Sequence, residues 1–288
     1  MNKLNKITII GVGLIGGSFA KGLKQAGLVK EIMGFGQNTT NLQKAIELDV
    51  VDSFTTDIAE AVQDSDLVFL AVPLGAMKTV LENMKPYLSE NTIITDGGSA
   101  KSSVILSAQE VFGELPENFV PGHPIAGKEK SGVTAADEQL YVDHRVILTP
   151  TAATSQASLE IVQGLWSALG ANVEIMNPQQ HDEIFAATSH LPHLLAFSLV
   201  DMLNEHEELG DVFQYTAGGF RDFTRIASSD AVMWRDIAVY NSEAIVKWLK
   251  NYGLALEELT KLVEEKDSDA LYTLFKDAKQ ARDKHIVN

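Results

Sequence analysis

The side chain best suited to chemistry in this sequence is His123, which lies in the stretch G-H-P-I-A-G at 122–127. Histidine has the ordinary pKa closest to neutrality, so it is the usual proton donor or acceptor in catalysis. Pro124 restricts the backbone of His123, and the glycines on either side allow a ligand to approach closely. The stretch therefore predicts a histidine that transfers a proton, against the alternative of a loop histidine without a function.

Ser99 is a second candidate, because it follows two glycines in D-G-G-S-A-K at 96–101, directly after a predicted strand. A serine in this place either caps the next helix or presents its hydroxyl to the crevice beyond the strand. Its position alone favours the cap.

Two more histidines, His190 and His193, lie three residues apart in S-H-L-P-H, on one face of a predicted helix. A zinc site would need further ligands at suitable spacing. The sequence has no cysteine and no His-Glu-x-x-His pattern, so we expect no metal.

Cations of interest occur in G-G-F-R-D-F-T-R at 218–225, where Arg221 and Arg225 share a face if the segment is helical. The alternative is a surface charge pair. The formal net charge of −16 repels anions, so an anionic ligand would need such local cations. Trp234, in M-W-R-D, is most simply a core or interface aromatic.

The element that positions these groups begins at the N-terminus. The apolar run 7–10 predicts a strand buried on both faces, and glycines 11, 13 and 16 then lead into a helix that ends near Gly27. Strand, Gly-x-Gly-x-x-Gly and helix are typical of a dinucleotide-binding turn, with the pyrophosphate at the helix N-terminus. The alternative is a glycine-rich turn without a ligand. Expected cofactor contacts are Gly11, Gly13, Leu14, Ile15, Gly16, and Val72 and Pro73 after the strand 66–72.

The choice of cofactor is left open by the second strand, predicted at 31–36. NAD sites usually carry an acidic residue at its end, where it binds the ribose hydroxyls. Gly36, Gln37 and Asn38 stand there instead, so nothing repels or clamps a 2′-phosphate. Asn38 either caps the next helix or contacts the ribose or phosphate. We expect NAD or NADP.

The predicted domain organisation follows from a change in the predicted secondary structure after residue 176, where strands give way to helices. Further strands are predicted at 91–96, 146–149 and 172–176, with helices at 76–84 and 155–169. Beyond them we expect only helices: 179–203, kinked or broken at Pro192, then 211–218, 230–251, 255–265 and 267–284. This predicts an α/β Rossmann-like domain with a parallel-rich sheet at 1–176 and an all-α domain at 177–288.

Composition excludes several classes of protein. The negative net charge argues against a nucleic-acid partner, and no apolar run is long enough to span a membrane. The chain starts almost directly with a strand, so we expect no signal peptide. The absence of cysteine is typical of a cytoplasmic protein.

Taken together and in this order, the motifs G-V-G-L-I-G-G-S, D-G-G-S-A-K, G-H-P-I-A-G, S-H-L-P-H, G-G-F-R-D-F-T-R and M-W-R-D resemble the prephenate dehydrogenase family. This family includes the cyclohexadienyl and arogenate dehydrogenases of tyrosine biosynthesis. The resemblance spans nearly the whole chain. The chain ends at Asn288, so we expect no fused regulatory or chorismate mutase domain.

The resemblance implies NAD(P)-dependent oxidative decarboxylation of prephenate to 4-hydroxyphenylpyruvate by a homodimer. It implies that His123 is the base or hydrogen-bond acceptor and that Ser99 orients it and the substrate hydroxyl. The implied substrate-binding residues are Arg225, His190, His193, Arg221, Glu129 and Trp234, the last able to reach a partner's site in a dimer whose helical halves intertwine. Alternatives are an arogenate-specific enzyme, a β-hydroxyacid or imine-type dehydrogenase, and a non-catalytic dinucleotide-binding regulator.

Overall fold

The computed structural model describes residues 3–128, 130–206, 208 and 210–286. The chain divides into two compact units, one up to Ser242 and one from Glu243 onward. The predicted boundary at 176/177 lies inside the first unit and stays a prediction.

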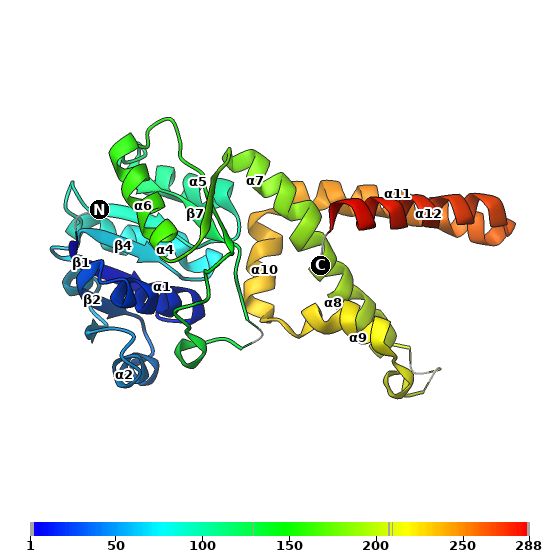
Figure 1. The fold of residues 1–288 in the computed structure, drawn as a ribbon, viewed down its shortest axis with the longest axis horizontal. Helices are drawn as coiled ribbons and strands as arrows, with labels where there is room; N and C mark the ends of the chain where they lie inside the picture. Colours follow the sequence, from blue (N-terminus) through cyan, green and yellow to red (C-terminus); the bar gives the residue numbers. More distant parts are fainter. Residues whose placement is uncertain (1–2, 129, 207, 209, 287–288) are drawn as a thin grey trace. The chain divides into compact units, whose positions relative to one another are not determined.

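The first unit is built on a six-stranded parallel sheet with the order β3-β2-β1-β4-β5-β6 (Figure 1). Its ligand crevice is expected beyond the carboxyl ends of the neighbouring strands β1 and β4, where the strand order reverses. The side chains of Ile7, Thr8, Ile9 and Ile10 are all buried, as expected for a central strand covered on both faces. The strands are β1 Leu4–Ile10, β2 Val29–Phe35, β3 Ser53–Thr55, β4 Leu67–Leu70, β5 Ile93–Asp96 and β6 Phe119–Val120. The predicted parallel-rich α/β fold is confirmed.

A second sheet of three strands has the order β7-β8-β9, with β7 antiparallel to β8 and β8 parallel to β9. Its strands are β7 Gly122–Pro124, β8 Arg145–Leu148 and β9 Asn172–Ile175. The sequence pattern does not predict β7, because three residues between glycine and proline show no alternation. His123 is thereby part of a strand, opposite Ile147.

Helices connect the strands, and their buried faces complete the core. They are α1 Leu14–Gln25, α2 Thr39–Glu47, α3 Ile58–Val62, α4 Leu74–Met84, α5 Lys101–Phe112 and α6 Gln156–Ala168. Phe19 of α1 packs between Phe69 of β4 and Trp166 of α6, with ring centroids 4.6 and 4.5 Å away. These contacts fix the start of α1 against the sheet.

The helical part of the first unit begins with a helix that is interrupted near Pro192, as predicted. α7 Pro178–Phe185 passes through a π-helical turn, Ala186–His190, into α8 Leu191–Asn204. Proline has no N–H to donate and its ring displaces the carbonyl four residues earlier, so the wider turn comes immediately before it.

The later helices differ from those predicted. A helix at 211–218 is wrong, because the structure has a 3₁₀ turn at Val212–Tyr215 and then α9 Gly218–Thr224, followed by a second 3₁₀ turn at Arg225–Ser228. A single helix at 230–251 is also wrong, since α10 Ala231–Tyr240 ends at Asn241, whose side chain bonds elsewhere in the unit. A separate helix at 255–265 is wrong too, because α11 Ser242–Glu265 runs unbroken through Gly253.

The second unit consists of nearly all of α11 and of α12 Ser268–His285. Large apolar side chains are exposed on it, including Leu254 at 65%, Val263 at 58% and Phe275 at 56%. Among the described residues, no helix is both long enough and apolar enough to cross a bilayer.

Candidate active site

His123 projects from β7 into a cluster of aromatic rings just beyond the carboxyl end of β6. Its Nδ1 lies 2.9 Å from Nε2 of His181, on α7. Phe185 packs against both imidazoles, with ring centroids 5.2 Å from His123 and 4.6 Å from His181. Loss of hydration, followed by the charges of His181, Lys101 and His190, holds the pKa of His123 well below its ordinary value. The imidazole is therefore neutral at pH 7 and can accept a proton.

Asp182 anchors His181 and joins α7 to the N-terminus of α5. Its Oδ1 lies 2.8 Å from His181 Nδ1, while its two carboxylate oxygens accept the backbone N–H groups of Lys101 and Ser102 at 2.7 and 2.8 Å. The first N–H groups of a helix have no partner inside it, so a carboxylate here is well placed. Despite burial, these bonds lower the pKa of Asp182 and keep it ionised.

A buried ion pair ties the turn after β5 to the strand that carries His123. Lys101 and Asp96 are fully buried and bonded to each other. Lys101 Nζ also donates to the Gly122 carbonyl at 2.6 Å, and Asp96 Oδ1 accepts the Gly122 N–H at 3.1 Å. The backbone one residue before His123 is therefore held by two charged side chains, each of which needs the other in a site without water.

Ser99 lies in the same turn, partly exposed, and it does not cap α5. The N-cap of α5 is Ala100, without a side-chain bond, and Asp182 takes the capping role. The helix-cap interpretation of Ser99 is thus wrong. Within the described part of the chain the Ser99 hydroxyl makes no hydrogen bond, and the partner of His123 is His181.

The π-helical turn places His190 in the interior beside Asn241. His190 is 1% exposed, and its Nδ1 lies 3.1 Å from Nδ2 of Asn241. The same Asn241 amide donates to the backbone carbonyl of Asp182 at 3.0 Å. Burial and the nearby His181 lower the pKa of His190 to about 4. Asn241 thus connects His190 with Asp182, and through Asp182 and His181 with His123.

His193, Trp234 and Arg225 form the outer part of the cluster. The ring of His193 stacks on that of Trp234 at 3.8 Å and 20°, while its Nδ1 donates to the Ser189 carbonyl at 2.8 Å. Burial lowers the pKa of His193, and the positive charge of Arg225 lowers it further. Trp234 is buried, and no partner for its Nε1–H occurs among the described residues. Arg225 is exposed, so its guanidinium is accessible from solvent.

The remaining expected substrate residues are less informative. Arg221 is exposed on α9. Glu129 lies outside the described residues. No group of three or more histidine or carboxylate side chains in the described ranges is arranged to hold a metal ion.

The glycine-rich turn between β1 and α1 has the shape that a dinucleotide needs. A Cβ on Gly11, whose φ is +95°, would lie 2.3 Å from the Ala71 carbonyl oxygen, and one on Gly16 would lie 2.4 Å from the Gly11 oxygen. Both positions thus require glycine. A Cβ on Gly13 would meet nothing within 4 Å, and Gly13 caps α1 without a side-chain bond. Open space therefore faces the unpaired N–H groups of α1, as a pyrophosphate requires.

The other expected cofactor contacts are distributed around this turn. A Cβ on Gly11 would also lie 3.1 Å from the side chain of Val72, so Val72 lines the turn, and Pro73 is the N-cap of α4. Asn38 caps α2 by accepting the Asn41 N–H at 3.0 Å, which supports its capping interpretation. Gly36 and Gln37 follow β2 directly, with Gln37 exposed.

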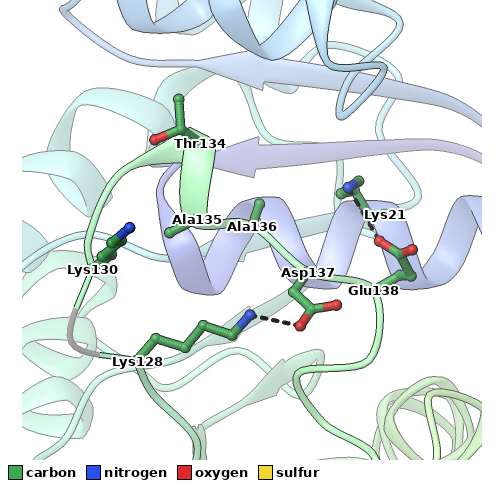
Figure 2. A pocket seen from close by; sticks show the side chains of 8 residues that line it. All are labelled: Lys21, Lys128, Lys130, Thr134, Ala135, Ala136, Asp137 and Glu138. Carbon is green, nitrogen blue, oxygen red and sulfur yellow. Dashed lines mark hydrogen bonds and ion pairs between the residues drawn. The ribbon is translucent and has the colours of Figure 1, made fainter.

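A surface hollow of about 590 Å³ lies between α1 and the loop after β7 (Figure 2). Two of its three lysines are already paired with carboxylates, Lys128 with Asp137 at 2.6 Å and Lys21 with Glu138 at 3.1 Å. Among the described residues, no predicted site residue lines it. Its described lining contains no histidine, so the histidine cluster is the better candidate site.

Sequence reasoning missed five residues that organise this cluster, namely Asp96, Lys101, His181, Asp182 and Asn241. Asp96 and Lys101 stand inside a motif that the sequence analysis quotes, so their types were available as a signal. His181 and Asp182 stand on the first turns of α7, where neither the spacing nor the neighbours suggest a partner for His123.

Comparison with known proteins identifies the family. The family model described as the prephenate dehydrogenase nucleotide-binding domain matches residues 19–175, and that described as the prephenate dehydrogenase dimerization domain matches 177–277. The chain is 36% identical to the cyclohexadienyl dehydrogenase of Zymomonas mobilis over 285 residues, covering 98% of this chain and 96% of that protein. It is also 36% identical to the prephenate dehydrogenase of Bacillus subtilis, covering 98% and 77%.

Solved structures agree with these relatives. The prephenate dehydrogenase of Aquifex aeolicus in complex with hydroxyphenyl propionate and NAD⁺ superposes with a TM-score of 0.91 at 38% identity, covering 97% of this chain and 98% of that chain. The arogenate dehydrogenase of Synechocystis gives a TM-score of 0.81 at 29% identity, covering 98% and 100%. The chain therefore belongs to the prephenate dehydrogenase family and is a dinucleotide-dependent oxidoreductase.

Proposed function

We propose that this protein catalyses the oxidative decarboxylation of prephenate to 4-hydroxyphenylpyruvate in tyrosine biosynthesis, with His123 as the residue that takes the hydroxyl proton. The observation that carries this assignment is a neutral imidazole on β7, directly after the last strand of the parallel sheet, with its Nδ1 held 2.9 Å from Nε2 of His181. His123 is partly exposed, whereas the neighbouring His181 and His190 are buried.

The chemistry requires one proton acceptor and an oriented substrate. The nicotinamide, when bound, accepts the hydride from the ring carbon that carries the hydroxyl. His123 accepts the hydroxyl proton as that carbon becomes a carbonyl. The bond to the ring carboxylate then breaks and carbon dioxide leaves. The electron pair of that bond makes the ring aromatic, and the ring oxygen takes back the proton from His123, which gives the phenol and returns His123 to its neutral form. Because aromatisation drives the reaction, the main task of the protein is to position the reactants.

Substrate carboxylates need cations in a protein of net charge −16. Arg225 is the best candidate, because its charge already reaches His193, which stacks on Trp234 inside the histidine cluster. A guanidinium can bind a carboxylate through two parallel hydrogen bonds. The buried N–H of Trp234, which has no partner among the described residues, would be a further donor next to His193. His190 and His193 would line the pocket, and Arg221 is the alternative clamp. Ser99 would hold the substrate hydroxyl.

The dinucleotide would lie on Gly11, Gly13, Leu14, Ile15 and Gly16, with Val72 and Pro73 on the other side of the crevice. The protein is proposed to use both NAD and NADP. Gly36 directly follows β2, at the position where an acidic residue would repel the 2′-phosphate of NADP. Asn38 is occupied as a helix cap, which leaves Gln37 as the nearest free polar side chain.

The chain is proposed to act as a homodimer. The exposed apolar side chains of α11 and α12 support this, as does the match of 177–277 to a dimerization domain. A cytoplasmic location is supported by the sequence alone, through the absence of cysteine.

Steady-state rates with prephenate and with arogenate, each measured with NAD and with NADP, test the proposal. Arogenate is the second candidate substrate because the arogenate dehydrogenase of Synechocystis has the same fold over the whole chain. We expect the highest kcat/KM for prephenate. A kcat/KM for arogenate more than about tenfold higher would make arogenate the substrate, and no turnover of either would refute the proposal.

A further inference from the structure

We propose that His181 and Asp182 are positioning residues that fix the proton of His123 on Nδ1, so that its Nε2 lone pair is the atom that accepts the substrate proton. This inference rests on the proposed function of His123. It adds two residues that the sequence motifs do not contain, and it names the reacting atom.

The assignment starts at Asp182, which can only accept. Its carboxylate oxygens bond two backbone N–H groups of α5 and lie 2.8 Å from Nδ1 of His181. A carboxylate has no proton to give, so His181 must carry its own proton on Nδ1. His181 is completely buried, and burial favours its neutral form. Its Nε2 is then an acceptor.

The next step leads to His123. Nε2 of His181 lies 2.9 Å from Nδ1 of His123, so a bond between them requires the proton to be on His123 Nδ1. A neutral imidazole has one N–H, so Nε2 of His123 carries the lone pair. Phe185 packs against both rings, which restricts their rotation and keeps the two nitrogens aligned.

The hydrogen-bonded series of Asp182, His181 and His123 is anchored at both of its ends. Asp182 is held at the start of α5, and its own backbone carbonyl accepts from Asn241 at 3.0 Å. His123 is held by its β7 pairing with β8. Both ends of the chain of groups are therefore fixed to secondary structure, which is what preorganised catalytic groups require. The charged and titratable groups nearest His123 are His181, Lys101 and His190.

Two substitutions at His181 separate hydrogen bonding from packing. Glutamine places an amide oxygen near the former Nε2 and can still accept from His123. Asparagine is shorter, so it can reach Asp182 but not His123. We expect His181→Gln to keep kcat within about threefold, and His181→Asn to lower kcat by at least ~10-fold, short of the ~10⁴-fold known for a reversed tautomer in a serine protease.

Binding and pH profiles distinguish positioning from general damage. KM for prephenate and the Kd of the cofactor should stay within about threefold in both variants. The acidic limb of kcat/KM should move to higher pH in His181→Asn, because water replaces the imidazole and rehydrates His123. Equal losses of kcat in the two variants would mean that His181 acts only by packing and would overturn the proposal.

A direct readout does not depend on activity. The protein has seven histidines, and ¹⁵N-labelled imidazoles give couplings that distinguish the two neutral tautomers. The His123 signals are identified by their loss in His123→Asn, and they should show the proton on Nδ1. A proton on Nε2 would refute the positioning chain. The two proposals can fail separately. If the wild-type protein shows the expected tautomer but His123→Asn keeps full activity, the proposed role of His123 as base is refuted and the positioning chain is not.

Discussion

Lowering the pH should destabilise this protein through His190, a residue whose neutral form the fold requires. His190 is 1% exposed, and its pKa lies at about 4 in the folded chain against 6.5 for an ordinary histidine. Since the folded pKa is the lower one, the unfolded chain binds more protons below pH 6.5, and stability falls as the pH falls. The contribution is fully present above pH 6.5 and is lost between 6.5 and 4.

The magnitude follows from the two pKa values. At pH 5 an unfolded histidine is almost fully protonated and His190 in the fold is mostly neutral, which corresponds to a loss of about 2 kcal/mol. Well below pH 4 the loss approaches about 3 kcal/mol, from roughly 2.5 pKa units at about 1.4 kcal/mol each. Such a loss is a large part of the stability of an ordinary domain.

The assay compares the free energy of unfolding in urea at pH 7.5 and pH 5, at one protomer concentration, for wild type and His190→Asn. Asparagine cannot titrate, yet its amide oxygen can replace Nδ1 as acceptor for the Asn241 amide. Wild type should lose about 2 kcal/mol more than the variant between the two pH values. Other titrating groups are common to both proteins, so their contributions cancel apart from the electrostatic coupling of His190 to the neighbouring histidines. Equal losses would refute the reasoning, because His190 would then not be held neutral.

Four further outcomes are expected. His123→Asn should lower kcat by ~10²–10⁴-fold with little change in prephenate KM, and a kcat near wild type would contradict its role as base. Arg225→Ala should raise the prephenate KM roughly 30-fold, which corresponds to about 2 kcal/mol, and Arg225→Lys should recover part of this loss. The cofactor Kd should stay within about threefold, and an unchanged KM would transfer the carboxylate-binding role to Arg221. Gly36→Asp should shift the cofactor preference toward NAD, and the side chain fits because a Cβ at this position meets only Leu42, at 3.7 Å. If the wild-type protein already rejects NADP by ~10³-fold, an acidic residue elsewhere must repel the 2′-phosphate. Light scattering at micromolar protein should give a dimer mass, and a monomer mass would remove the proposed dimer.

The sequence by itself determined the features that depend on neighbouring residues. The buried strand β1, the glycine turn and α1 are local, since the apolar run and the spacing of three glycines allow few other conformations. The interruption at Pro192 is local too, because proline acts on the turn that precedes it. The end of α10 at Asn241 and the continuation of α11 through Gly253 were predicted wrongly, because the former depends on a distant bond and propensity alone is a weak guide.

The tertiary structure decided which groups face one another. His123 and His181 are 58 residues apart, and Lys101 and Asp182 are 81 apart, so nothing in their local sequence relates them. Asp182 replaces Ser99 as the partner of α5 only because α7 packs there, and a buried carboxylate aimed at unpaired N–H groups is a stronger partner than a hydroxyl. The motifs predict that a histidine is reactive, whereas burial and the neighbouring rings decide its protonation, and that is a property of the assembled fold.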